Sequence, residues 1–63
     1  MKETYRDSTT TIFEDESGNV YGIIKDNSRK DVYTVTARRP GEKARTLATR
    51  CTWDTAQALI KNQ

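Results

Sequence analysis

The stretch VYTVTARRPGEKARTLATR, residues 32–50, decides the fold that the rest of the chain must adopt. Two runs rich in β-branched residues flank a Pro-Gly pair, which is the composition of two strands joined by a tight turn. Proline at the second position of a turn fixes φ and glycine at the third supplies a positive φ, so Arg39–Glu42 fits a type II turn. This stretch therefore predicts a β-hairpin with strands over 32–38 and 44–50.

The first strand of this hairpin has a clear alternation. Tyr33, Val35 and Ala37 occupy every second position, and threonine or arginine stands between and after them. Because successive side chains of a strand point to opposite faces, the apolar set should face the core. Leu47 and Cys51 should share that side in the second strand. The opposite face should be open and rich in threonine and arginine.

Upstream, two further segments of strand length, 9–14 and 20–25, are separated by polar turn clusters at 15–19 and 26–31. Each connection has the length of a hairpin loop, so the four strands should form an antiparallel meander. Residues 1–8 are polar, and we expect them to be a flexible N-terminal tail.

Downstream, the hydrophobic period changes. Trp53, Ala56 and Ile60 recur at helical spacing, which predicts a helix over 53–62 with Trp53 as its main anchor. This helix should fold back across one face of the sheet. The predicted class is therefore α+β, a four-stranded antiparallel β-meander followed by one C-terminal helix packed on one face, in the order ββββα.

Length and composition allow one small domain, over 9–63. The 63 residues are 33% hydrophobic and 32% charged, which predicts a marginal stability of about 3–5 kcal/mol. A single cysteine, Cys51, excludes an internal disulfide, and the absence of histidine excludes Cys/His zinc sites, so we expect no metal and no cofactor. Neither a signal peptide nor a membrane-spanning run is visible, which favours the cytoplasm.

Catalytic chemistry has little support. Without histidine, Cys51 has no imidazole base, and no glycine-rich phosphate loop exists among three glycines. Glu14 and Glu16 could form a carboxylate pair, but they stand at an expected turn, where like charges are usually solvated. The sequence therefore predicts no catalytic residues and a protein that is not an enzyme.

Charge is unevenly distributed along the chain, although its net value is only +2. Residues 1–24 carry two basic and five acidic side chains, whereas residues 25–50 carry eight basic and three acidic ones. In a meander the first and third turns lie at the same end of the sheet. The acidic turn Glu14–Glu16 should then lie about 10 Å from the basic turn Arg38–Lys43, within reach of partial neutralisation. Two solvated turns of opposite charge are the competing explanation for this pattern.

A basic hairpin beside a threonine-rich face favours nucleic acid as a partner. A two-stranded ribbon or a small sheet can enter a major groove, where Arg and Thr contact bases and Lys contacts phosphates. A weaker hypothesis has Tyr21 and Tyr33 stacking on single-stranded bases, in competition with a place in the core. The candidate nucleic-acid-binding residues are Thr34, Thr36, Arg38, Arg39, Lys43, Arg45 and Arg50.

The segment TLATRCTWDTAQALI, residues 46–60, resembles the end of the arm-binding N-terminal domain of phage-type integrases and of the plant AP2 domain. In those families a strand leads to an aromatic residue, a threonine and a helix with alanine on its inner face. The resemblance covers the last three predicted strands and the helix, and the chain departs from it by an additional first strand and an acidic first turn. It implies that the sheet, not the helix, meets DNA. The residues in corresponding places here are Trp53, Thr55, Ala56 and Leu59.

The sequence thus predicts a small non-enzymatic nucleic-acid-binding or regulatory module, of the accessory kind that phages and plasmids encode. The alternative is a protein-interaction module, such as a phage-encoded inhibitor of a host protein or a homodimeric accessory factor, which accounts better for the near-balanced charge. A homodimer is expected by pairing of the uncharged edge at 8–13 or by stacking of the open faces.

Overall fold

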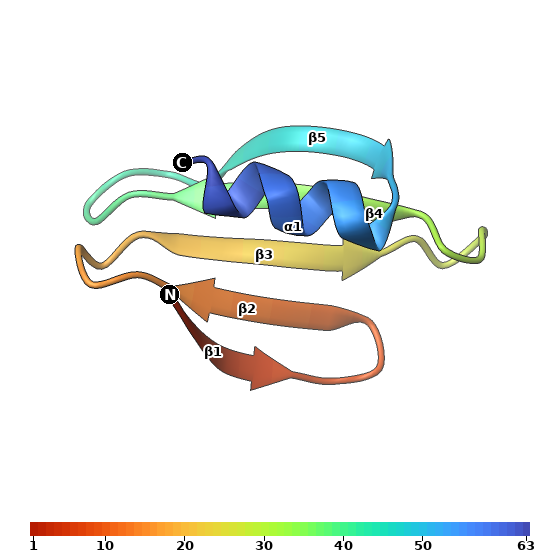
Figure 1. The fold of residues 1–63 in the computed structure, drawn as a ribbon, viewed down its shortest axis with the longest axis horizontal. Helices are drawn as coiled ribbons and strands as arrows, with labels where there is room; N and C mark the ends of the chain where they lie inside the picture. The colour runs from red at the N-terminus through yellow and green to blue at the C-terminus, as the bar shows by residue number, and fades with distance from the viewer.

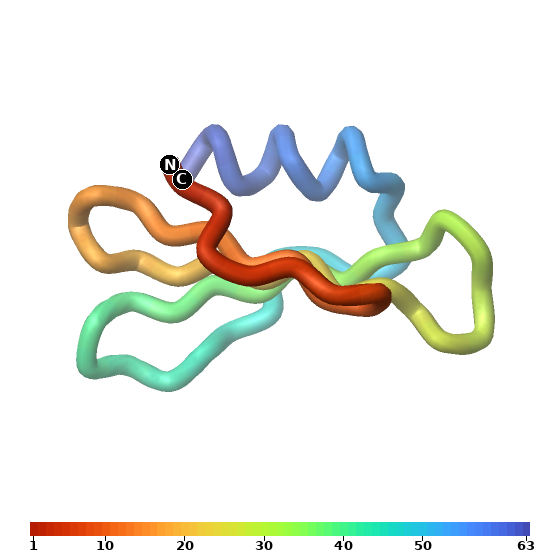
Figure 2. Tube along the Cα trace, turned by 90° about the horizontal axis from the view of Figure 1, so that it is seen from below, coloured from red at the N-terminus to blue at the C-terminus, as the bar shows by residue number.

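The computed structural model describes all 63 residues and has a five-stranded antiparallel sheet with one helix on one face (Figure 1). Figure 2 shows the helix as a separate layer above the sheet. The α+β class, the meander and the C-terminal helix are confirmed, but the predicted number of four strands is wrong. This helix is too short and too polar to cross a lipid bilayer. The elements are β1 (Lys2–Arg6), β2 (Thr10–Glu14), β3 (Val20–Lys25), β4 (Tyr33–Arg38), β5 (Arg45–Cys51) and α1 (Trp53–Lys61).

Strand β1 occupies the segment for which the sequence predicts a flexible tail. It pairs antiparallel with β2, although all five of its side chains are exposed. The turn between them is closed by Asp7, whose backbone N–H donates to the Thr10 carbonyl at 2.9 Å. The Asp7 carboxylate accepts from the backbone N–H groups of Thr9 and Thr10 at 2.8 and 2.7 Å. Because backbone pairing and turn chemistry make this strand, hydrophobic alternation could not reveal it.

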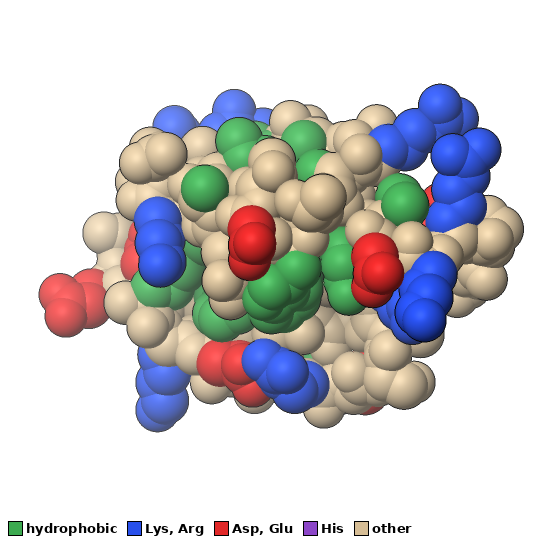
Figure 3. Space-filling view, turned by 45° about the vertical axis from the view of Figure 1, so that its right-hand side comes forward, with side chains coloured by type: hydrophobic (Ala, Val, Ile, Leu, Met, Phe, Trp, Pro, Cys, Tyr) green, Lys and Arg blue, Asp and Glu red, His purple; other side chains and the backbone are tan.

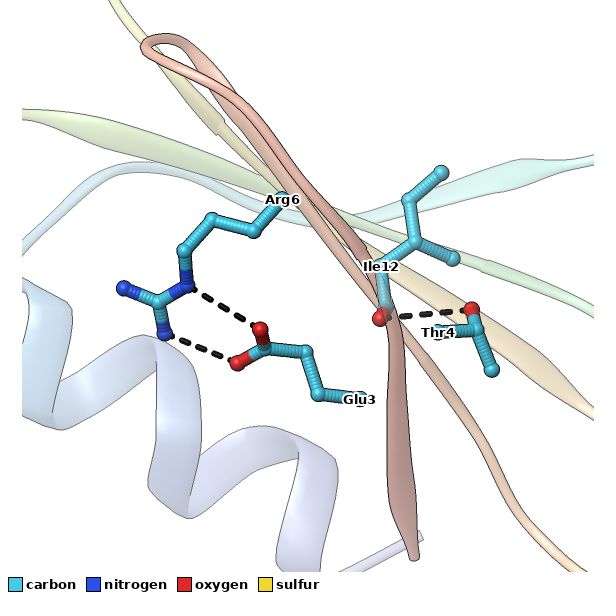
Figure 4. A network of polar contacts seen from close by, with 4 residues as sticks. All are labelled: Glu3, Thr4, Arg6 and Ile12. Carbon is cyan, nitrogen blue, oxygen red and sulfur yellow. Dashed lines mark hydrogen bonds and ion pairs between the residues drawn. The ribbon is translucent and has the colours of Figure 1, made fainter.

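A register shift in β1 brings two charged side chains to the helix side of the sheet. Glu3 lies opposite Phe13 and Arg6 opposite Thr11, so β1 contains one extra residue between these pairs. In a regular strand, residues three apart face opposite sides, whereas this bulge puts both on one side. The Arg6 guanidinium then donates to both carboxylate oxygens of Glu3, at 3.1 and 2.8 Å (Figure 4). It also lies over the ring of Trp53, with its central carbon 5.9 Å from the ring centroid.

The core lies between α1 and the sheet, where the helix packs mainly on β4 and β5. Val35 and Ile23 are almost completely buried, at 0% and 1% exposed. The predicted alternation in β4 is confirmed, since Val35 and Ala37 are buried while Thr34 and Thr36 are half-buried on the other face. The buried hydrophobic residues are Tyr21, Ile23, Val35, Ala37, Ala56 and Ile60.

Helix α1 begins at Trp53, as predicted, and the Thr52 side chain caps its first turn. Ala56 and Ile60 are its buried residues, so the expectation that Trp53 is the main anchor needs correction. The indole is only half-buried and packs edge-on against Tyr33, with ring centroids 5.4 Å apart. Two turns of helix carry the small and branched side chains that fit closest to the sheet, which leaves the larger indole at the rim.

The sheet edges differ from those that the sequence predicts. The uncharged Thr10–Phe13 segment is an interior strand because β1 pairs along it, so the expected pairing of two chains through this edge is wrong. The real edges are β1, which carries Lys2, Glu3 and Arg6, and β5, which has two register shifts against β4. Charged side chains and bulges at an edge oppose pairing with another sheet.

We expect the β1–β2 hairpin to lose stability between about pH 4 and pH 2. Hydrogen bonds from the Tyr5 hydroxyl, and next from the Thr9 and Thr10 backbone, lower the pKa of Asp7 from 3.8 to about 2. A carboxylate whose pKa is lowered by folding stabilises the fold above its unfolded pKa. That contribution is lost as the pH falls through the folded value.

The variant Asp7→Asn tests this expectation, because its amide oxygen can still accept the turn's hydrogen bonds but does not titrate. Thermal midpoints measured by circular dichroism from pH 5 to pH 2 should fall less in the variant than in the unsubstituted chain. Parallel pH profiles for the two chains would contradict the role of Asp7.

Candidate nucleic-acid interface

The connection between β4 and β5 forms the Pro-Gly turn that the sequence predicts. The backbone N–H of Glu42 donates to the Arg39 carbonyl at 3.0 Å, and Gly41 has φ +77°. All residues from Arg38 to Thr46 are exposed, so the whole tip stands in solvent beyond the buried part of the sheet. We call residues 38–45 the basic tip, because Arg38, Arg39, Lys43 and Arg45 lie within it.

None of the cations of the basic tip forms an ion pair. Of the eleven Lys and Arg side chains, only Arg6 pairs with a carboxylate, that of Glu3. The acidic turn nevertheless lies beside the basic tip, as expected, because a Cβ at Gly18 would lie 3.2 Å from Cγ of Pro40. Figures 1 and 2 show the two turns at the same end of the molecule. The turns touch through uncharged atoms, and their charges remain in solvent.

The acidic turn uses its central carboxylate for its own structure. Asp15 accepts from the backbone N–H groups of Ser17 and Asn19 at 3.0 and 2.9 Å, and from the Asn19 side-chain amide at 3.0 Å. These bonds, that of the Asn19 side chain first, hold the pKa of Asp15 below its usual value. Asp15 is therefore engaged within its own turn, and it forms no ion pair with the arginines of the basic tip.

The centre of the face opposite the helix is uncharged. Ile12, Gly22, Thr36 and Thr46 follow one another across four strands as cross-strand neighbours. Gly22 has no side chain, and a Cβ there would lie 2.8 Å from Oγ1 of Thr36, so the threonine side chain occupies the space above the glycine. Thr34 lies on the same face, two residues earlier in β4. Both predicted threonines are therefore on the open face, as the alternation indicates.

The cations of the basic tip do not all share this face. Arg38 follows the alternation of β4 to the open face and lies opposite Val20. Arg45 lies opposite Ala37, a core residue, and so belongs to the helix side. The basic tip therefore presents charge on both sides of the sheet end.

Arg50 does not belong to the basic tip. It precedes Cys51, which pairs with Tyr33 at the start of β4, whereas the basic tip follows the end of β4. Five residues of strand place it roughly 17 Å from Arg45. Arg50 has φ +53° at a register shift of β5, and it lies at the end of the sheet where β3 joins β4 through Arg29 and Lys30. Figure 3, in which this end comes forward, shows a group of basic side chains at the right of the view and others at the left and bottom.

The positions of Tyr21 and Tyr33 do not suit stacking on bases, and other side chains are exposed instead. Tyr21 is 4% exposed and belongs to the core, whereas Tyr33 is half-buried, lies against the core and packs on Trp53. Sequence reasoning missed Tyr5 and Ile24, which are 50% and 39% exposed on the open face. Tyr5 was hidden in a segment without alternation, whereas alternation within β3 could have marked Ile24.

Substitution of Gly41 tests whether the turn of the basic tip requires a positive φ. No atom lies within 4 Å of a Cβ built on Gly41, so only its positive φ restricts the residue type. Gly41→Val should lower the free energy of unfolding by about 1–2 kcal/mol, because β-branched residues are strained at positive φ. Gly41→Asn should cost clearly less, since asparagine tolerates this region. Urea unfolding measures both, and equal losses would show that the turn does not require positive φ.

Comparison of the chain with protein-family models, with curated proteins and with solved structures found no match. The interpretation of this surface therefore depends on the placement of its threonines and cations.

Proposed function

We propose that this protein is a small non-enzymatic nucleic-acid-binding module, with a regulatory or accessory role in the cytoplasm of the kind that phages and plasmids encode. The observation that carries the proposal is the basic tip, where Arg38, Arg39 and Lys43 are exposed and form no ion pair. These cations lie at one end of the threonine-bearing open face. Such an arrangement supplies positive charge beside a polar surface that can approach bases.

Contacts to phosphates and contacts to base edges have different effects on binding. Arg and Lys side chains with no carboxylate partner are free to neutralise phosphates, and the release of condensed counterions then drives binding. A threonine hydroxyl both donates and accepts hydrogen bonds, so Thr34 and Thr36 can contact base edges. Phosphate contacts set position and affinity, whereas base contacts set sequence preference.

The resemblance to integrase arm-binding and AP2 domains favours the same surface, since it implies that the sheet rather than the helix meets DNA. In this chain α1 lies on the opposite face from Thr34 and Thr36, so the helix leaves that face free. The additional strand β1 extends the sheet beyond the part that the resemblance covers. It adds Tyr5 to the open face at the edge far from the basic tip.

A protein-interaction module is the second candidate, and one observation favours it. Ile24 and Tyr5 expose apolar surface on the open face, and Ile12 lies half-buried next to Tyr5 on the neighbouring strand. Apolar surface of this kind suits a protein partner or a second copy of the chain, stacked face to face. Nucleic-acid binding remains the first proposal because the unpaired cations outnumber these apolar groups.

Replacing Arg38, Arg39 and Lys43 with alanine tests the proposal. If the unsubstituted chain makes four to six phosphate contacts, the slope of log affinity against log salt should be about −4 to −5 on duplex DNA. The triple variant should bind all sequences more weakly and flatten this slope by about three. Fluorescence anisotropy with random duplex and single-stranded oligonucleotides at several salt concentrations measures both effects.

A triple variant at the opposite end of the sheet, Lys25→Ala with Arg29→Ala and Lys30→Ala, is the matched control. It removes the same charge, so an equal effect would show that net charge rather than the basic tip governs binding. Absence of binding to DNA and RNA by the unsubstituted chain at low salt would refute the proposal and favour a protein partner.

A further inference from the structure

A small hollow lies on the helix side of the sheet, next to the basic tip. Its volume is about 70 Å³, and its lining includes Tyr21, Ala37 and Arg45. These three residues are consecutive in one row across β3, β4 and β5. The single methyl group of Ala37 stands between two long side chains, which accounts for the space. Tyr21 and Ala37 are buried and form its apolar base.

Three arginines line this hollow, and Asn19 and Gln63 complete its lining. Arg38 and Arg39 line it together with Arg45, and none of the three pairs with a carboxylate. No Asp or Glu lines the hollow, and the hydroxyl of its lining residue Tyr21 donates to Asp15 at 3.5 Å. That carboxylate already accepts hydrogen bonds within its own turn, so its oxygens are occupied. Three arginines therefore line one small concave site that has no Asp or Glu in its lining and in which none of them forms an ion pair.

We propose that this hollow binds one phosphate group. Arginine presents a planar fork of N–H donors that matches phosphate oxygens, and several forks around one cavity suit a tetrahedral oxyanion. A volume of about 70 Å³ has room for such a group. Tyr21, Ala37 and Arg45 face the helix side whereas Arg38 belongs to the open face, so the site lies at the end of the sheet, and neither Thr34 nor Thr36 lines it. The phosphate can be free phosphate or belong to a nucleic-acid backbone.

The first experiment is a titration of ¹⁵N-labelled protein with inorganic phosphate, with sodium chloride adjusted to keep ionic strength constant. Amides of residues 37–39 and 45 should shift in a saturable way, together with the Nε–H signals of the three arginines. Arg45→Ala should weaken phosphate binding at least tenfold. Lys43→Ala removes the same charge from the basic tip outside the hollow, and it should weaken binding less than threefold.

Two further variants distinguish a specific phosphate site from nonspecific electrostatic attraction. Arg45→Lys keeps the charge but loses the fork, so binding should still weaken at least threefold. Ala37→Val fills the hollow without changing charge and should abolish saturation while leaving the spectrum folded. Non-saturable shifts, or equal losses in the Arg45→Ala and Lys43→Ala variants, would overturn the site, and the exposed Arg45 variants decide this even if Ala37→Val does not fold.

Competition identifies the source of the phosphate. Displacement of inorganic phosphate by duplex DNA would support the site with a backbone phosphate as its ligand, whereas phosphate binding that duplex DNA leaves unchanged would support it with free phosphate. Phosphate binding without any affinity for nucleic acid would refute the function proposed above and leave this site standing. Nucleic-acid binding that is equally sensitive to Arg45→Ala and Lys43→Ala, with no phosphate binding, would refute the phosphate site and leave the proposed function standing.

Discussion

One helix of nine residues covers one face of a five-stranded sheet, and the rest of the structure depends on this packing. Ala56 and Ile60 join Val35 and Ile23 in a core of six buried hydrophobic residues. The helix leaves the opposite face uncovered, and that face carries Thr34, Thr36, Gly22, Ile12, Ile24 and Tyr5. The choice of the covered face thereby determines which surface remains for a partner.

The charged side chains also divide into two groups, those held in local contacts and those unpaired at the basic tip. Glu3 and Arg6 pair on the helix side because a bulge in β1 brings them together, and Arg6 then lies over the helix's first residue, Trp53. Asp15 is held inside its own turn by hydrogen bonds. Glu3 and Asp15 thus form local contacts, whereas no cation of the basic tip forms an ion pair. Charge that is unpaired at one end of a sheet can serve recognition.

Regular repetition made part of this fold predictable. The alternation of β4, the Pro-Gly turn and the period of α1 are each specified by neighbouring residues, and all three were predicted at their places. Strand β1 could not be predicted, because it has no buried side chain and exists through pairing with β2. Arg50 lies far from the basic tip because five residues of β5 separate it from Arg45, whereas its positive φ and the register shift of β5 depend on the pairing of β4 with β5. The hollow beside Ala37 depends on three strands at once, so no local pattern could show it.

We propose that nucleic acid meets the open face and the basic tip, and not the helix. Chemical-shift mapping of ¹⁵N-labelled protein with a random-sequence duplex at low salt tests it most directly. Amides of Thr34, Thr36, Arg38 and Arg39 should shift together, while those of α1 should stay in place. Shifts concentrated on α1, or a spectrum that the duplex leaves unchanged, would contradict the account.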